Sequence, residues 1–111
     1  MARVLVVDDD EMSRTILRNL LEKVGHQVVE AKDSDEGLKC FRQRHIDLVI
    51  TDLFMPEIGG LGLMAQLKAE DEHVKMIAVS GVGLENKHAI FLSAQQKGAA
   101  YTLEKPIQSR P

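Results

Sequence analysis

Polar side chains that could take part in chemistry stand directly after apolar segments at several places in this 111-residue chain. They are Asp8 and Asp9 after Val4–Val7, Asp52 after Leu48–Thr51, Ser80 after Val74–Val79, and Lys105 after Ala100–Leu103. Carboxylates repel one another, so a group of them requires a cation nearby. Mg2+ prefers oxygen ligands, and a carboxylate beside it can attack phosphorus to form an aspartyl phosphate. These residue types indicate phosphoryl transfer, with a lysine and a hydroxyl to stabilise the phosphoryl oxygens.

Those residues can meet only if the segments that carry them belong to one sheet. Short apolar, β-branched runs predict strands at Val4–Val7, Gln27–Ala31, Leu48–Ile50 (ending at Thr51-Asp52), Val74–Val79 and Ala100–Leu103. Apolar residues at helical spacing predict helices from Met12 to Val24, from an N-cap at Ser34 through Phe41, from Leu61 to Leu67, and from Leu84 to Lys97.

Strands that alternate with helices predict an α/β fold, in which helices cover both faces of a parallel sheet. In open sheets of this kind, ligands bind at the carboxyl ends of the strands, near the point where the strand order reverses. All the polar side chains named above follow strands, so they are expected on one edge of the sheet. The alternation therefore predicts that three carboxylates and a lysine converge on one pocket.

Composition narrows the classes of protein that the chain can belong to. Its length fits one domain, and 44% apolar with 28% charged residues is typical of a globular core. The net charge is -3 and the sequence has no basic block, so we do not expect this domain to bind nucleic acid directly. No apolar run approaches the ~20 residues of a membrane span, and no secretory signal is visible. The single cysteine, Cys40, fits a reducing cytoplasm.

The motifs "VVDDD", "DLVITDLFMPEIGG", "IAVSG" and "GAAYTLEKP", in this order and at strand ends, resemble those of a known family. From Arg3 to Ile107 the chain resembles a receiver domain of a two-component response regulator, similar to the stand-alone chemotaxis regulators of bacteria. The resemblance implies a flavodoxin-like, doubly wound, five-stranded parallel sheet of order 2-1-3-4-5. It also implies a receiver domain over residues 1–107, with a tail over 108–111.

The resemblance assigns a role to each candidate residue. Asp52 would be the phosphoacceptor, Ser80 would hydrogen-bond the phosphoryl group, and Lys105 would pair with it. The metal ligands for Mg2+ would be Asp8, Asp9, Asp52 and the backbone carbonyl of Phe54. The phosphoryl group would come from a sensor histidine kinase or a histidine phosphotransfer protein in the cytoplasm. The chain would catalyse only its own phosphorylation and dephosphorylation, and it would signal by contact with a partner.

The chain departs from the family's pattern in two places. The usual aromatic residue three positions before Lys105 is replaced by Thr102, and Tyr101 lies one position further back, which turns its ring to the other face of a strand. The usual fifth helix also has too few residues to form after Lys105. Strand residues such as Leu5, Val7 and Val49 are therefore expected to be partly bare, depending on which face each one takes, and this favours either a homodimer or a truncated version of a longer protein.

Two other functions fit parts of the same sequence. "DDDEMS" with a later lysine also resembles haloacid-dehalogenase-type phosphatases, in which Asp8 would be the nucleophile and Asp10 the second aspartate. A receiver-fold interaction domain that is not phosphorylated is the second alternative, because the usual aromatic residue is missing. The acidic Asp10 and Glu11 are otherwise read as the solvated start of a helix, where carboxylates are favoured.

Overall fold

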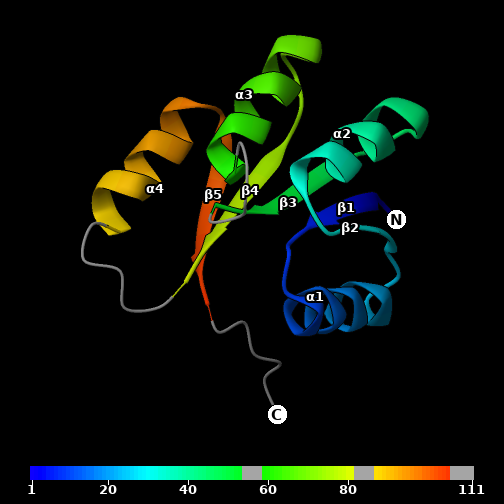
Figure 1. The fold of residues 1–111 in the computed structure, drawn as a ribbon. Coiled ribbons are helices and arrows are strands. Elements are labelled where there is room, and N and C mark those ends of the chain that lie inside the picture. Colours follow the sequence, from blue (N-terminus) through cyan, green and yellow to red (C-terminus); the bar gives the residue numbers. More distant parts are fainter. Residues whose placement is uncertain (54–58, 82–86, 106–111) are drawn as a thin grey trace.

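The computed structural model describes residues 1–53, 59–81 and 87–105, and within them strands and helices alternate along the chain (Figure 1). In chain order the elements are β1 (Arg3–Val7), α1 (Glu11–Lys23), β2 (Gln27–Ala31), α2 (Ser34–Gln43), β3 (Leu48–Asp52), α3 (Gly59–Glu70), β4 (Met76–Ser80), α4 (Lys87–Gln96) and β5 (Ala99–Glu104).

The strands form one sheet in the order β2-β1-β3-β4-β5, and every neighbouring pair is parallel. The predicted flavodoxin-like topology is therefore confirmed. The chain leaves β1 for β2 on one side and later returns to place β3 on the other side of β1. The strand order reverses between β1 and β3, so the carboxyl ends of these two strands flank the position where such sheets bind ligands.

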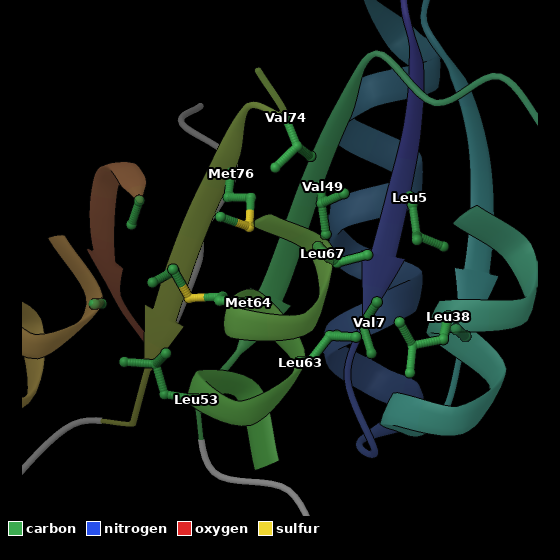
Figure 2. Close-up of a cluster of buried hydrophobic side chains, with 14 residues drawn as sticks. Leu5, Val7, Leu38, Val49, Leu53, Leu63, Met64, Leu67, Val74 and Met76 are labelled. Atoms are coloured by element: carbon green, nitrogen blue, oxygen red, sulfur yellow. The ribbon is translucent and has the colours of Figure 1, made fainter. Parts of the chain in front are cut away.

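One face of the sheet is covered by α2, α3 and α4, and Figure 2 shows the apolar cluster between these helices and the strands. Leu63 and Leu67 of α3 are fully buried in it, and burial of such a side chain stabilises the fold by roughly 1.5–3 kcal/mol. Leu5, Val7 and Val49 belong to the same cluster and are fully buried. The expectation that these three would be partly bare is wrong, because their side chains point to the face that α2–α4 cover.

The opposite face packs against α1, which lies on the other side of the sheet in Figure 1. The buried residues of this smaller cluster are Val4, Val6, Leu17, Ile50 and Val79. The first strand thus sends its apolar side chains alternately to two cores. This explains why its sequence is a continuous apolar run rather than an alternating one.

Tyr101 lies on the α1 face of the edge strand β5. It is in register with Ile77 of the smaller cluster, whereas Thr102 is in register with Ala78 of the larger one. Tyr101 is 69% exposed. The predicted one-residue offset is confirmed, since Tyr101 and Thr102 occupy opposite faces of the sheet.

The first two helices begin at aspartate caps. Asp10 caps α1, and Asp33 caps α2 by accepting a hydrogen bond from the backbone N–H of Glu36 at 2.8 Å. The predicted cap at Ser34 is one residue late, because Ser34 already lies in the helix and donates its hydroxyl to a backbone carbonyl at the start of α3. Among the described helices, none is long and apolar enough to cross a membrane.

Strand boundaries differ slightly from the predicted ones. The fourth strand begins at Met76 rather than Val74 and ends at Ser80, and the fifth extends over Ala99–Glu104. The predicted beginning of the fourth helix at Leu84 lies outside the described residues. Ser80 is thus the last residue of its strand, which places its hydroxyl at the same edge as the acidic residues.

Candidate functional site

Three carboxylates meet at the carboxyl edge of the sheet. Asp8 follows β1 directly, Asp52 is the last residue of β3, and each of Asp8, Asp9 and Asp52 offers an oxygen within 4.8 Å of the others. Asp8 and Asp52 are only 1% and 5% exposed, whereas Asp9 is exposed to solvent. Because the parallel strands β1 and β3 are neighbours, their ends bring together residues that are far apart in the sequence.

Lys105 supplies the cation that this group requires. Its Nζ lies 2.9 Å from Oδ2 of Asp8 and donates to Oδ2 of Asp52 at 3.2 Å. Burial alone would lower the pKa of Lys105, but the hydrogen bond that Lys105 donates to Asp8 and the charge of Asp52 outweigh it, so the pKa lies above its ordinary value. Lys105 is therefore charged at neutral pH and bridges the two buried carboxylates.

The backbone fixes the position of Lys105 after the edge strand. Its N–H donates to the carbonyl of Ser80 at 2.7 Å, which continues the β4–β5 ladder by one residue. The long side chain can then reach across from β5 to the ends of β1 and β3. The sequence prediction that a lysine after the fifth strand meets aspartates after the first and third strands thus agrees with the geometry.

Ser80 is completely buried, and its Oγ has no hydrogen-bond partner among the residues that the structure describes. A buried hydroxyl without a partner costs about 1–3 kcal/mol. Buried polar atoms nearly always have a partner in the protein or in ordered water, so an exception calls for an explanation such as a role in binding or catalysis. Ser80 ends β4, next to Asp52 at the end of β3, so its hydroxyl belongs to the same edge as the carboxylates.

Asp10 has a different environment from its two acidic neighbours. Its carboxylate accepts hydrogen bonds from the N–H of Met12 at 3.2 Å and from the hydroxyl of Ser13 at 2.9 Å. The bond from Ser13 lowers the pKa of Asp10. In addition, the N–H of Asp10 donates to Oδ1 of Asp8 at 2.9 Å. Asp10 therefore caps α1 and orients Asp8, and its carboxylate points to the helix.

The donor set suits a hard divalent cation. Three carboxylates and one lysine leave two negative charges unbalanced, which is the charge that one Mg2+ would neutralise. The ligand atoms that the three aspartates offer are all oxygens, as Mg2+ prefers, and exposed Asp9 leaves room for the waters that this ion retains. The predicted further ligand, the carbonyl of Phe54, lies outside the described residues.

Sequence reasoning missed the importance of Gly60 for this edge. A Cβ built on Gly60 would lie 2.0 Å from the carbonyl oxygen of Asp52 and 2.6 Å from the Cα of Leu53. The first turn of α3 thus packs directly on the backbone that presents Asp52. The signal was the Gly59-Gly60 pair, which indicates a close backbone approach as well as the start of a helix.

The sequence as a whole matches known signalling proteins. A family profile described as the response regulator receiver domain matches residues 4–111. The chain is 34% identical over 110 residues to the chemotaxis protein CheY of Listeria monocytogenes, which covers 98% of this chain and 90% of that protein. It is 36% identical over 104 residues to the CAI-1 autoinducer sensor kinase/phosphatase CqsS of Vibrio cholerae. That match covers 94% of this chain but only 15% of CqsS.

Solved structures of response regulator proteins also resemble this chain. A response regulator receiver domain protein from Clostridium thermocellum matches with a TM-score of 0.86 and 34% identity, over 97% of this chain and 85% of that one. The response regulator protein TrrA from Thermotoga maritima, in complex with Mg2+-BeF, matches with a TM-score of 0.83 and 30% identity. This second match covers 97% of this chain and 90% of TrrA.

Proposed function

Because this chain belongs to the family of response regulator receiver domains, we propose that it is a signalling switch phosphorylated on Asp52. The phosphoryl donor is a histidine kinase or a histidine phosphotransfer protein, and Mg2+ is the cofactor. The phosphorylated domain then signals by contact with an output partner. Its chemistry is restricted to its own phosphorylation and dephosphorylation.

In the proposed transfer, an oxygen of the Asp52 carboxylate attacks the phosphorus of a phosphohistidine. The new P–O bond forms as the P–N bond breaks, and the imidazole nitrogen leaves with the electron pair. In the dephosphorylation step, a water oxygen attacks the phosphorus of the acyl phosphate, inorganic phosphate forms, and Asp52 leaves as a carboxylate. Both steps place additional negative charge on oxygens that are close to buried carboxylates, so cationic and donor groups must stabilise that charge.

Among the residues that the structure describes, Lys105 and Ser80 are suited to that requirement. Lys105 already lies 3.2 Å from Asp52 and can follow the charge onto the phosphoryl oxygens. The buried Ser80 hydroxyl is available to donate a hydrogen bond to a phosphoryl oxygen. We assign Lys105 to charge stabilisation and Ser80 to orientation of the phosphoryl group.

Asp8, Asp9 and Asp52 are the residues that would hold Mg2+. When bound, this ion neutralises charge on the phosphoryl oxygens as they approach the carboxylates. TrrA, one of the similar receiver structures, is in complex with Mg2+-BeF, which supports the choice of metal. Between the two buried aspartates, Lys105 balances only part of the negative charge, so this chain alone leaves the site prepared for a second cation.

One observation supports the proposal most strongly, namely the convergence of Asp8, Asp52 and Lys105 with bond lengths of 2.9 and 3.2 Å. The phosphatase alternative required Asp8 and Asp10 to act on one substrate. That alternative is not favoured, because the Asp10 carboxylate is engaged by Met12 and Ser13 at the start of α1.

The partners belong to the proposal as well. The match to a segment of CqsS, whose name describes a sensor kinase/phosphatase, supports a sensor kinase as the partner, and we place this exchange in the cytoplasm as part of the proposal. We assign no nucleic acid and no membrane as a direct partner. We also propose a second copy of the chain as a partner, in a homodimer.

Incubation with acetyl phosphate and Mg2+, followed by intact mass measurement, tests the proposal. The wild type should gain one phosphoryl mass only when both reagents are present, and Asp52→Asn should gain none. Asp47→Asn is a matched control, because Asp47 directly precedes β3 whereas Asp52 ends it. Asp47→Asn should behave as the wild type. Equal phosphorylation of Asp52→Asn and the wild type would refute the assignment.

A further inference from the structure

We infer that Arg14 is a positioning residue for the metal ligands, because it holds the peptide that joins Asp8 to Asp9. This inference rests on the proposed function, in which those two aspartates bind Mg2+. Arg14 lies in the second turn of α1, and its side chain is only 16% exposed. Its Nη1 donates a hydrogen bond of 2.7 Å to the backbone carbonyl of Asp8.

That carbonyl has a particular place in the site. It belongs to the peptide group whose N–H is that of Asp9, so the orientation of the Asp8 oxygen fixes the plane of this peptide. The direction in which the Asp9 side chain leaves the backbone depends on that plane. Asp9 itself is exposed, so packing does little to hold its carboxylate.

Further hydrogen bonds fix the residues on either side of this peptide. The N–H of Asp8 donates to the carbonyl of Ala31 at 3.1 Å, and the N–H of Asp10 donates to Oδ1 of Asp8 at 2.9 Å. The bond from Arg14 fixes a third polar group of this turn, the carbonyl of Asp8. Together the three bonds leave the turn after β1 with one orientation, which a metal site needs before the ion arrives.

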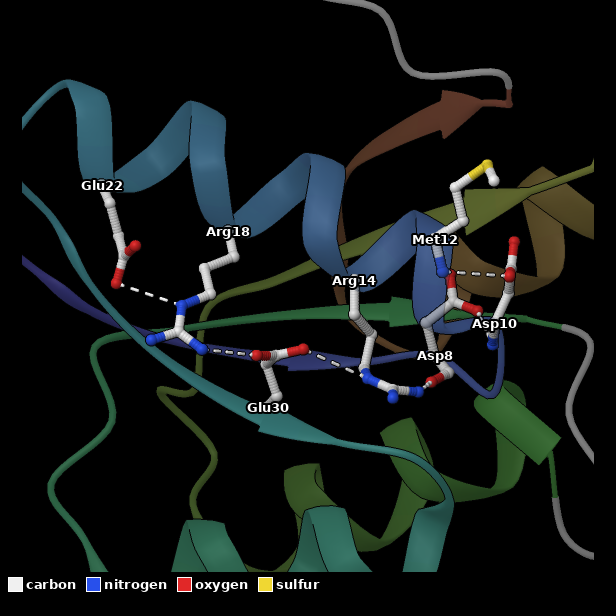
Figure 3. Close-up of polar contacts among 7 residues, drawn as sticks. All are labelled: Asp8, Asp10, Met12, Arg14, Arg18, Glu22 and Glu30. Carbon is white, nitrogen blue, oxygen red and sulfur yellow. Dashed lines mark hydrogen bonds and ion pairs between the residues drawn. The ribbon is translucent and has the colours of Figure 1, made fainter.

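The guanidinium of Arg14 is itself held in place, as Figure 3 shows. Its Nε donates to Oε1 of Glu30 at 3.2 Å, and Nη1 of Arg18 donates to Oε2 of Glu30 at 2.8 Å. Arg18 also contacts Glu22 at 3.2 Å. The carboxylate of Glu30 on β2 is thus shared by two arginines from successive turns of α1, and only one of these arginines reaches Asp8.

Arginine suits this position because of its geometry. Its planar guanidinium carries donors that point in different directions, so one side chain can bind a carboxylate and a carbonyl together. A lysine ammonium on a flexible stem could keep the charge and pair with Glu30. It could not reproduce both bonds in a fixed arrangement.

A simpler reading is that Arg14 and Arg18 merely tie α1 to β2 through Glu30. Under that reading the two arginines are equivalent, and their substitutions have similar effects. A third reading is that Arg14 acts through its charge alone. Its removal would then make the acidic site more negative and strengthen Mg2+ binding, whereas loss of positioning weakens it. The direction of the change therefore separates these readings.

The test compares Arg14→Gln, Arg14→Lys and Arg18→Gln with the wild-type chain by calorimetric titration of Mg2+. Loss of a group that orients a metal ligand typically lowers metal affinity by 10- to 100-fold, and we expect about tenfold at this hydrated site for Arg14→Gln. Arg14→Lys should also weaken binding despite its retained charge. Arg18→Gln, the matched control, should change the dissociation constant by less than about twofold.

The backbone amide signal of Asp9 in the metal-free protein gives a second, independent readout. It should shift in both Arg14 variants and remain in place in Arg18→Gln. The inference would be overturned if Arg14→Gln and Arg18→Gln had equal effects on Mg2+ affinity and on this signal, or if Arg14→Gln bound Mg2+ more tightly than the wild type. In either case, Mg2+ binding by the wild type would still support the proposed function. Absence of Mg2+ binding by the wild type would overturn the proposed function and the inference with it.

Discussion

Two ionic clusters in this molecule contain hydrogen bonds of similar length but differ in burial and in charge balance. On the outer surface, Arg42 of α2 donates from Nε and Nη2 to both carboxylate oxygens of Glu70 on α3, with a shortest distance of 2.6 Å. At the carboxyl edge of the sheet, Lys105 is shared by buried Asp8 and Asp52. The surface pair has one cation for one anion, and the buried cluster has an excess of carboxylates.

This difference indicates what each cluster does. An exposed, balanced pair can link two helices and needs no further partner. A buried excess of negative charge lowers the stability of the fold, and it is retained where a site requires it. The hydroxyl of Ser80 at the same edge has no hydrogen-bond partner within the described part of the chain, which is a second unfavourable feature that a bound group would relieve.

The largest expected difference between the two clusters concerns the metal. We predict that Asp9→Ala lowers the rate of phosphorylation by acetyl phosphate by at least about a hundredfold, because it removes an exposed carboxylate that reaches the proposed Mg2+. The increase in melting temperature on addition of Mg2+ should disappear as well. Glu70→Gln, which removes a carboxylate from the surface pair, should preserve both properties. Wild-type phosphorylation of Asp9→Ala would show that this residue does not serve the site.

A smaller effect is expected on the metal-free protein. We predict that Asp52→Asn raises the free energy of unfolding by roughly 1–2 kcal/mol, because it relieves repulsion between carboxylates less than 5 Å apart while leaving the 2.9 Å pair of Lys105 with Asp8 intact. Urea unfolding in the presence of a chelator measures this change. A clear loss of stability in Asp52→Asn would mean that the cluster is not under repulsion.

The smallest effect is expected at the surface pair. The hydrogen bonds from Arg42 hold the pKa of Glu70 below its ordinary value of 4.5. The stabilisation from the pair is therefore present above pH 4.5, and it is lost as the pH falls through the lowered pKa of the folded state. Arg42→Gln should cause a small loss of stability at pH 7, none in strong acid, and no change in Mg2+ affinity. Titration of Glu70 by NMR should show its pKa rising toward 4.5 in the variant. If the titration midpoint of Glu70 were the same in the variant and the wild type, Arg42 would not be what lowers the pKa of Glu70.

Much of the candidate site could be predicted because parallel sheets bind ligands at the carboxyl ends of their strands. Asp8, Asp52, Ser80 and Lys105 all stand at or just after the ends of strands, and in a parallel sheet those ends share an edge. The order of the strands came from the family resemblance. Local spacing alone does not determine which strands are neighbours.

The direction of individual strand side chains could not be predicted. Val4–Val7 is apolar throughout, so no alternation shows which residues meet α2–α4 and which meet α1. That ambiguity led to the wrong expectation for Leu5 and Val7. The misplaced cap of α2 has a different cause, because Asp33 and Ser34 are adjacent and both are good cap residues.

Contacts between charged residues distant in the sequence were also beyond prediction. The link from Glu30 to Arg14 spans 16 residues, and it depends on how α1 lies across β2. An arginine in the second turn of a helix carries no local signal of that kind. The support of the metal ligands by Arg14 could be recognised only from the three-dimensional arrangement.

Mapping the phosphoryl group to a residue tests the central claim most directly. The protein is phosphorylated with acetyl phosphate and Mg2+, the acyl phosphate is reduced with borohydride to a stable alcohol, and the modified residue is located by peptide mass spectrometry. We predict modification of Asp52 alone. Modification of Asp8 in place of Asp52 would contradict the account and favour the phosphatase alternative.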